Sequence, residues 1–383
     1  MAKLGELYKI TSGGTPSRKH LEYYENGTIP WVKTGDLKSK YLYETDEKIT
    51  ETGLKNSSAK IYPKDTVLLA MYGATIGAAS ILQTEAATNQ ACAAFVKNDK
   101  IMPEYLYAFL ESQRNRFIKD AVGGAQPNIS ASYLKEIAFP LIPLDEQRRI
   151  AAVLDKVTDL IAQRRAQLDK LDLLIKSRFV EMFGDPVDNS RGWDTIKLKD
   201  IGTCKNGMNF HTDNFGVKIH CLGVADFKDK SFIEGTSQLA VISLNEMPTE
   251  EYLLKNRDIV FVRSNGNKSL VGRSVMVYPG ATPTTFSGFC IRFRLQSESL
   301  RPIYLLRVLK TDSVRKKLAG RGANIQNLNQ KILLELSVPI PPLELQDSFE
   351  NFEKRIVQLR APVRQSLNRL EILKTSLMQQ YFG

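Results

Sequence analysis

A long helical pattern that occurs twice is the feature that most constrains this chain. From Ile150 onward, eight of the ten positions reached by alternating steps of four and three are apolar, with Arg164 and Arg178 at the other two. Residues 144–183 contain neither Pro nor Gly. A mean spacing of 3.5 residues is typical of a coiled-coil seam, rather than of a general core face. The same pattern returns from Leu345, and Phe349 lies 199 residues after Ile150. We therefore expect two long helices that pair along their seams. The predicted seam residues are Ile150, Leu154, Val157, Ile161, Leu168, Leu171, Ile175, Phe349, Phe352, Ile356, Leu359, Leu370, Leu373 and Leu377.

The repeat extends into the segments before each helix. Pro103 has a counterpart at Pro302, and the run from Pro140 to Gln147 has one from Pro339 to Gln346, again 199 residues later. Solenoid repeats are far shorter, so this is a duplicated domain pair. The predicted order is a globular domain at 1–143, a helix at 144–184, a second globular domain at 185–342 and a second helix at 343–383.

Each globular segment mixes short strands, glycine turns and helices. In the first, residues 64–72 read as a strand, Gly73 and Gly77 mark a turn, and a helix follows from Pro103 to about residue 119. The predicted class is a mixed α/β (α+β) fold. Antiparallel pairing of the long helices gives it pseudo-two-fold symmetry. The first helix measures roughly 57 Å at 1.5 Å per residue, and Pro362 is expected to kink or split the second near Leu359.

Composition narrows the class of protein further. Lys and Arg exceed Asp and Glu by 11 charges, which favours a polyanionic partner. We find no apolar leader or membrane-length apolar run, and the four cysteines have no paired spacing, so a reduced, cytoplasmic protein is expected. Phosphate-binding and methyl-donor motifs, nucleophile triads and metal-ligand spacings are not found. The chain is therefore expected to be non-catalytic and to hold no metal or cofactor.

The order of these motifs resembles the specificity subunit of type I restriction-modification systems. The resemblance covers the whole chain, and is clearest at Gln126 to Ser130, Phe139 to Gln147 and Val338 to Gln346. It implies that each globular half is a target recognition domain for one part of a split double-stranded DNA sequence. It also implies two modification subunits carrying S-adenosylmethionine, and motor-nuclease subunits that use ATP and Mg.

Polar turns at the ends of strands are the candidate DNA contacts. Arg and Lys pair with guanine, Asn and Gln read adenine, and glycine-rich loops offer backbone amides to phosphate. The same residue types also build solvated turns, and that alternative stays open for each of them. The candidates are Lys33, Thr34, Asp36, Tyr72, Thr75, Asn89, Gln90, Gly124, Gln126, Arg263, Ser264, Asn265, Asn267, Lys268, Ser287 and Arg321.

Two readers on a fixed spacer predict half-sites about one helical turn, roughly 34 Å, apart. Because the turns differ between the halves, the expected target is asymmetric. The rival hypothesis is a coiled-coil scaffold that joins two protein-binding domains and binds no DNA. A nearer variant is the specificity subunit of a system with a fused nuclease-methylase.

Overall fold

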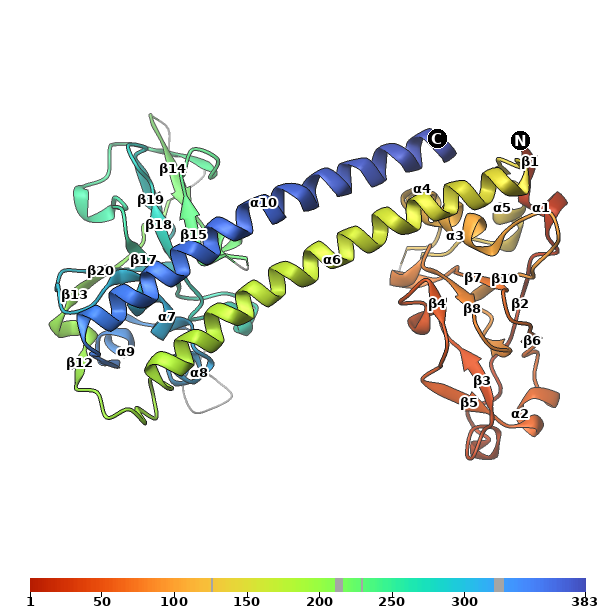
Figure 1. The fold of residues 1–383 in the computed structure, drawn as a ribbon, viewed down its shortest axis with the longest axis horizontal. Coiled ribbons are helices and arrows are strands. Elements are labelled where there is room, and N and C mark those ends of the chain that lie inside the picture. The colour runs from red at the N-terminus through yellow and green to blue at the C-terminus, as the bar shows by residue number, and fades with distance from the viewer. Residues whose placement is uncertain (125–126, 211–215, 229, 320–326) are drawn as a thin grey trace. The chain divides into compact units, whose positions relative to one another are not determined.

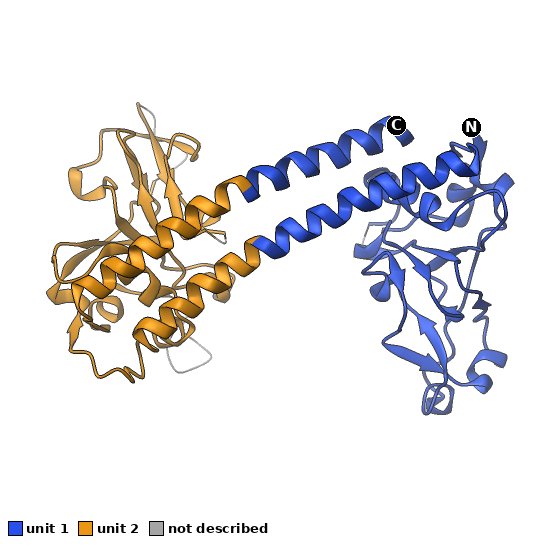
Figure 2. Cartoon of the chain, in the orientation of Figure 1, with its two compact units in different colours: residues 1–167, 363–383 blue, residues 168–362 orange. Residues whose placement is uncertain are grey.

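The computed structural model describes residues 1–124, 127–210, 216–228, 230–319 and 327–383 (Figure 1). The chain forms two compact units, shown in Figure 2. Unit 1 consists of residues 1–167 and 363–383, and unit 2 of residues 168–362. Each unit thus contains one globular domain and part of both long helices. None of the described helices is long and apolar enough to cross a membrane.

Unit 1 is built on a five-stranded sheet in the order β2-β10-β7-β8-β4 and a four-stranded sheet in the order β5-β3-β9-β6. The pair β4–β8 is parallel, and the other pairs of the larger sheet are antiparallel. The pair β1–β11 closes the domain next to the long helix. The strands are β1 (Ala2–Lys3), β2 (Thr11–Ser12), β3 (Ile29–Val32), β4 (Tyr41–Leu42), β5 (Glu47–Ile49), β6 (Ile61–Tyr62), β7 (Val67–Ala70), β8 (Ala79–Leu82), β9 (Ala86–Thr88), β10 (Cys92–Phe95) and β11 (Ala138–Phe139). The helices are α1 (Leu4–Leu7), α2 (Glu51–Lys55), α3 (Pro103–Ser112), α4 (Arg114–Asp120) and α5 (Ala131–Lys135).

Unit 2 repeats this plan. Its five-stranded sheet has the order β13-β20-β17-β18-β15, with a smaller sheet β16-β14-β19 and the pair β12–β21. The outer pair β15–β18 is again parallel. The strands are β12 (Thr195–Lys197), β13 (Gly202–Asn206), β14 (Val217–Leu222), β15 (Phe232–Glu234), β16 (Val241–Leu244), β17 (Asp258–Val262), β18 (Ser274–Tyr278), β19 (Thr284–Phe286), β20 (Cys290–Leu295) and β21 (Ser337–Pro339). The helices are α7 (Pro302–Lys310), α8 (Asp312–Ala319) and α9 (Gln330–Leu334). The predicted mixed α/β class and the tandem duplication are confirmed.

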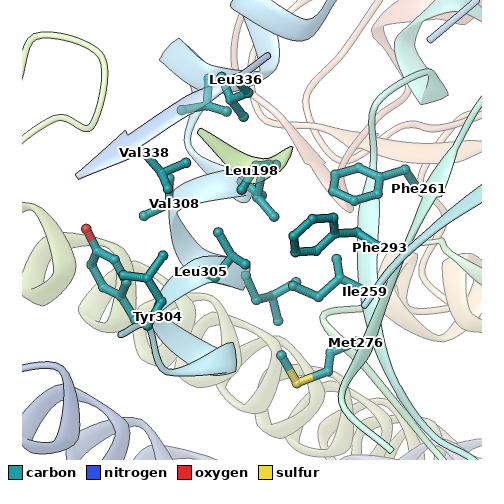
Figure 3. Packing of buried hydrophobic residues seen from close by; sticks show 14 of the residues in the cluster. Leu198, Ile259, Phe261, Met276, Phe293, Tyr304, Leu305, Val308, Leu336 and Val338 are labelled. Atoms are coloured by element: carbon teal, nitrogen blue, oxygen red, sulfur yellow. The ribbon is translucent and has the colours of Figure 1, made fainter. Parts of the chain in front are cut away.

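The central sheet of unit 2 is apolar on both faces. Because side chains alternate along a strand, Ile259 and Phe261 of β17 join the cluster under α7, whereas Val260 and Val262 join a second cluster on the opposite face. Figure 3 shows Leu305 of α7 among the side chains of the first cluster. Sheets buried on both faces leave function to the loops at their ends.

The long helices α6 (Leu144–Phe183) and α10 (Leu343–Phe382) each have 40 residues. In unit 1, the first part of α6 packs beside the last part of α10, where Arg165 and Glu371 form an ion pair of 2.7 Å. In unit 2, the last part of α6 packs beside the first part of α10, where Phe179 meets Phe349 at a ring-centroid distance of 5.5 Å. Within each unit the helices therefore run antiparallel, as predicted.

The seam of α10 does not follow every predicted position. Leu359 is 57% exposed and Leu373 is 44% exposed, so neither lies in a buried seam. The next residues point inward instead: Arg360 pairs with Asp172 at 2.8 Å, and Lys374 pairs with Glu111 at 3.0 Å. At these two points the inward position lies four residues after the preceding seam residue, where a step of three was expected. Arg360 and Lys374 occupy these positions because their charged ends form ion pairs with acidic residues.

The other predicted seam residues are buried or half-buried. Pro362 does not split α10, so that part of the expectation is wrong. Pro362 removes the donor for the carbonyl of Gln358. Both residues are exposed, and water can therefore hydrate that carbonyl.

A fully buried glutamine at the start of each long helix fastens it to its domain. In unit 1, Met102 N–H donates to Gln147 Oε1 at 2.9 Å, and Gln147 Nε2 donates to the carbonyls of Lys100 and Ile142 at 2.9 and 2.8 Å. Both amide hydrogens and the carbonyl oxygen of the Gln147 side chain are hydrogen-bonded within the domain, and the start of α6 is fixed against the start of α3.

Unit 2 has the same arrangement around Gln346. Arg301 N–H donates to its Oε1 at 2.7 Å, and its Nε2 donates to the carbonyls of Ser299 and Pro341 at 3.2 and 2.8 Å. Every partner lies 199 residues after its counterpart in unit 1. The two glutamines therefore perform the same structural task in the two units.

The phenylalanine at the end of each long helix enters a core. Phe382 of α10 contacts Tyr105 and Phe109 in unit 1, with ring centroids 5.4 and 5.8 Å apart. Phe183 of α6 contacts Tyr304 in unit 2 at 4.8 Å. Each globular domain is thus held by the start of one long helix and by the end of the other.

Charged contacts between domain and helix differ between the units. In unit 1, Lys40 Nζ lies 2.5 and 2.7 Å from the two carboxylate oxygens of Asp155 on α6. In unit 2, Arg307 of α7 forms a two-pronged ion pair with Glu353 of α10, including Nε to Oε2 at 2.9 Å. The ion pairs that attach each domain to a long helix therefore involve different residues at different positions in the two units.

Candidate nucleic-acid interface

Four separate loops meet at one end of the sheets of unit 1. The Asn89 N–H donates to the Val32 carbonyl at 2.9 Å, which joins the β9–β10 turn to the end of β3. The Met71 N–H donates to the Ala91 carbonyl at 2.8 Å, and the Gly73 N–H donates to the Pro127 carbonyl at 2.9 Å. The segments that carry Lys33, Tyr72, Asn89 and Asn128 are therefore neighbours, although they are far apart in the sequence.

Unit 2 brings the equivalent loops together through equivalent backbone bonds. The Ser287 N–H donates to the Leu222 carbonyl at 3.0 Å, and the Arg263 N–H donates to the Phe289 carbonyl at 2.7 Å. The Arg263 carbonyl accepts from Leu328 N–H at 2.8 Å. The candidates from Arg263 to Asn267 and Ser287 thus lie on adjoining loops, and the same frame presents different side chains in the two units.

Asp36 is buried and does not present its carboxylate to solvent. Its Oδ2 accepts the Lys33 N–H at 2.7 Å and closes the turn after β3, while burial raises its pKa. Asp226 closes the matching turn of unit 2, accepting from Gly223 N–H at 2.8 Å. The Asp36 carboxylate therefore shapes the turn, and its predicted contact with DNA stays a prediction.

Lys33 is engaged in an ion pair rather than free. Its Nζ lies 2.5 Å from Glu47 Oε1, and this hydrogen bond is the largest cause of the lowered pKa of Glu47. Arg18 reaches the other oxygen of the same carboxylate at 2.6 Å. The Glu47 carboxylate is thus shared by the two cations Lys33 and Arg18.

Several polar candidates build the turns on which they sit. Thr75 Oγ1 donates to the Tyr72 carbonyl at 3.2 Å, and Asn89 Oδ1 accepts from Ala91 N–H at 3.1 Å. Asn265 Oδ1 and Asn267 Oδ1 accept backbone N–H groups at 2.8 and 3.0 Å. These bonds are the expected solvated-turn roles, and for the asparagines they also fix which way the amide groups point.

The remaining candidates divide by exposure. Gln90 and Gly124 are exposed, Thr34, Tyr72, Arg263 and Ser264 are half-buried, and Ser287 is buried. Gln90 Oε1 accepts from Thr15 Oγ1 at 2.5 Å, and Arg263 reaches the Gly288 carbonyl at 3.4 Å. Gln126, Arg321 and the side chain of Lys268 lie outside the described residues. Whether any of these groups touches DNA stays a prediction.

Sequence reasoning missed a basic group on unit 2 beside the loop at Ser269. Arg315 donates to the Ser269 carbonyl at 3.0 Å, Arg273 to the Lys228 carbonyl at 2.9 Å, and Lys310 to the carbonyls of Lys230 and Ser274 at 3.0 and 3.2 Å. Burial, followed by the nearby charge of Arg307, lowers the pKa of Lys310 to about 8. These cations come together only in the fold, because Lys310 of α7 and Arg315 of α8 lie far in the sequence from Arg273 before β18, so spacing gave no signal.

Sequence reasoning also missed two exposed phenylalanines, Phe210 and Phe289. Phe289 follows Gly288 in the β19–β20 turn, among the candidate contacts. An aromatic residue in a tight turn between two buried strands was the available signal. No group of three or more His, Cys, Asp and Glu side chains suited to a metal ion occurs among the residues described.

Comparison with known proteins places these features in a family. The family model described as the type I restriction modification DNA specificity domain matches residues 1–171 and 190–358. The MjaIX specificity subunit of Methanocaldococcus jannaschii is 29% identical over 300 residues, covering 72% of this chain and 68% of the relative. The StySPI specificity subunit of Salmonella potsdam is 26% identical, covering 94% and 83%.

Solved structures share the fold. The type I restriction-modification S subunit from M. genitalium superposes with a TM-score of 0.57 at 15% identity, over 100% of this chain and 95% of that one. A chain from a study of complex assembly and conformational transition of the type I system gives a TM-score of 0.62 at 17% identity, over 100% and 96%. At these sequence identities the superpositions show a shared fold alone.

Proposed function

Because the chain belongs to the type I restriction modification DNA specificity family, we propose that its two units read the two halves of a split, asymmetric duplex target. Membership makes it a specificity subunit, a class whose role is DNA recognition and which is generally non-catalytic. The proposal adds which parts of this chain do the reading and what they are placed for.

The observation that carries the proposal is the repeated meeting of loops. In each unit, backbone hydrogen bonds gather the loops after β3 or β14, after β7 or β17, and before β10 or β20. Unit 1 presents Tyr72, Asn89 and Gln90 there, whereas unit 2 presents Arg263, Asn265 and Asn267. Amide side chains suit adenine and a guanidinium suits guanine, so one frame with two sets of groups favours two different half-sites.

The second support is the continuity of the two long helices and their attachment to the domains. Gln147 and Gln346 fasten the long helices with three hydrogen bonds each, and α6 and α10 are unbroken over 40 residues. An unbroken helix of that length measures about 60 Å. We propose that these helices hold the two readers about one turn of DNA, roughly 34 Å, apart, and so set an unread gap.

The proposed partners supply the chemistry. Two modification subunits that bind S-adenosylmethionine would methylate adenine at N6, and motor-nuclease subunits that use ATP and Mg would cleave unmodified DNA, in the cytoplasm. This chain binds duplex DNA and positions these subunits at the target sequence. Its excess of 11 positive charges suits a phosphate backbone.

The test is selection of bound duplexes from a random pool, using the chain assembled with its modification subunit. We expect a motif split by an unread gap, with binding that weakens steeply as salt rises because counterions are released. Exchanging residues 1–143 for those of another specificity subunit should change one half of the motif and leave the other. Unselected sequence together with salt-insensitive binding would overturn the proposal and favour a protein-binding scaffold.

A further inference from the structure

The exposed side chain of Phe289 has no evident structural role. It is 61% exposed, and Phe210 is the other exposed phenylalanine among the described residues. Burying such a side chain is worth about 1.5–3 kcal/mol relative to leaving it in water. A large apolar group left outside a well-packed domain therefore points to something that covers it when the protein works.

The backbone that carries Phe289 is firmly held. Its carbonyl accepts from Arg263 N–H at 2.7 Å and from Ser264 N–H at 3.4 Å, and its N–H donates to Ser287 Oγ at 3.3 Å. The preceding Gly288 N–H donates to the Met208 carbonyl at 2.7 Å. A Cβ at Gly288 would lie 2.0 Å from Asn209 Oδ1, so the Asn209 side chain packs closely against this turn. The exposed ring is thus carried by a backbone turn that hydrogen bonds hold in place.

Unit 1 shows that the same backbone turn forms without a phenyl group. The equivalent position is Ala91, whose carbonyl accepts from Met71 N–H at 2.8 Å and whose N–H donates to Asn89 Oδ1 at 3.1 Å. The same turn therefore closes around a methyl side chain. The phenyl group of Phe289 is an addition specific to unit 2, and the fold alone does not explain it.

The surroundings of Phe289 indicate the kind of surface that covers it. Its backbone is bonded to Arg263 and Ser264, and Asn209 borders the turn. A protein partner that buried the ring would also have to satisfy these polar groups. The major groove of DNA offers both kinds of contact at once, since base edges bear hydrogen-bonding atoms and thymine adds an apolar 5-methyl group.

We propose that Phe289 is a specificity-determining residue of unit 2 that contacts the 5-methyl group of a thymine in the second half-site. This inference rests on the proposed DNA-reading function. It adds an apolar contact to the polar groups around it and gives unit 2 a preference that the alanine in unit 1 does not provide to the same extent.

The experiment compares thymine with deoxyuridine, which lacks only the methyl group. Duplexes carrying the selected target are made with single T-to-dU replacements in each half-site, and the assembled chain with its modification subunit is titrated with each. One buried methyl group contributes about 0.8 kcal/mol, which corresponds to a loss of affinity of about fourfold. We expect that loss at one thymine of the second half-site.

Two variants complete the test. Phe289→Ala should bind the T and dU forms of that site equally, whereas Phe289→Leu should keep part of the difference. Replacements in the first half-site should give the same ratio with Phe289→Ala as with the unmodified chain. An unchanged unfolding midpoint for Phe289→Ala, expected for an exposed side chain, excludes misfolding as the cause.

The outcomes separate this inference from the proposed function. A second half-site without thymine, equal affinities of the unmodified chain for T and dU, or an unchanged ratio in Phe289→Ala would each overturn the role of Phe289, while selective binding would still support the DNA reader. Loss of all selective binding by the unmodified assembly would overturn both.

Discussion

Replacing Glu353 by Leu should destabilise unit 2 strongly, although it puts an apolar residue into a buried position. The Glu353 side chain is 1% exposed and its partner Arg307 is 11% exposed. Leucine cannot pair with the guanidinium, so the change leaves a buried cation without its counter-ion. The first repeat shows the apolar solution: its equivalent residues are Leu154 and Ala108, both in the core of unit 1.

The expected magnitude follows from burial. Removing one partner of a buried ion pair costs about 3–5 kcal/mol, whereas replacing both by packed apolar residues is often neutral. Glu353→Leu and Arg307→Ala should each reduce the free energy of unfolding by about 3–5 kcal/mol. The double variant, which copies the first repeat, should lie within about 2 kcal/mol of the unmodified chain. Besides packing differences, it loses the contact of Arg307 with Ser231 and the position of its guanidinium over the ring of Phe232.

The two tryptophans allow each unit to be followed by itself. Trp193 belongs to unit 2 and Trp31 to unit 1. In a Trp31→Phe background, urea unfolding measured by the fluorescence of Trp193 reports on unit 2. Lys40→Met, which breaks the attachment of unit 1 to Asp155, serves as the matched control and should leave that transition in place.

Strict additivity would refute the reasoning. If the double variant loses as much stability as the two single variants together, the ion pair contributes nothing as a pair and Arg307 is not stranded by Glu353→Leu. A single Glu353→Leu variant as stable as the unmodified chain would have the same meaning.

Three further predictions concern the helices and the half-buried lysine Lys310. The pKa of Lys310 is about 8 against 10.5 unpaired in water, so between about pH 8 and pH 10 the unfolded chain holds a proton that the native chain has released. The stability of unit 2 should therefore rise with pH in that window relative to Lys310→Met, and a pH-independent difference between the two proteins would contradict the lowered pKa of Lys310. Phe382→Ala should destabilise unit 1 by about 3–5 kcal/mol, seen by Trp31 in a Trp193→Phe background, while Phe183→Ala should act on unit 2; loss of the wrong transition would contradict the assignment of these side chains. Ile356→Ala should cost about 2–5 kcal/mol, whereas Leu359→Ala should stay within about 0.5 kcal/mol, and equal effects in urea unfolding would contradict the observed seam.

The architecture was predictable because paired helices and duplicated domains each produce a regular pattern in the sequence. Heptad spacing predicted both long helices, and the exact recurrence of residues such as Pro103 and Gln147 after 199 positions predicted two similar domains. The phase of the second seam was not predictable in the same way. Leu359 and Leu373 match the expected heptad positions of apolar residues. Arg360 and Lys374 lie inward instead, because they form ion pairs with Asp172 of α6 and Glu111 of α3. Partners that folding brings together are invisible to a rule about spacing.

The sequence indicated polar turns at strand ends as candidate contacts, but not that these turns meet in each unit, because backbone hydrogen bonds between distant segments bring them together. The turn-closing role of Asp36 was not foreseen, because a short acid three residues after an N–H closes a turn as readily as it contacts a ligand. Phe289 was overlooked, because buried and exposed phenylalanines look alike in a sequence. The identity of a residue limits its chemistry, and only its surroundings decide which part of that chemistry is used.

The entry of Phe382 into the core of unit 1 has a consequence for how the chain is made. Unit 1 comprises residues 1–167 and 363–383, so part of its core is translated last. At 5–20 residues per second a ribosome needs roughly 10–40 seconds to travel from Gln167 to Phe382. During that interval the nascent N-terminal domain exposes the surface around Tyr105 and Phe109 that Phe382 later covers. A premature stop codon just before position 363 would therefore harm the domain encoded first, although its first 167 codons are intact.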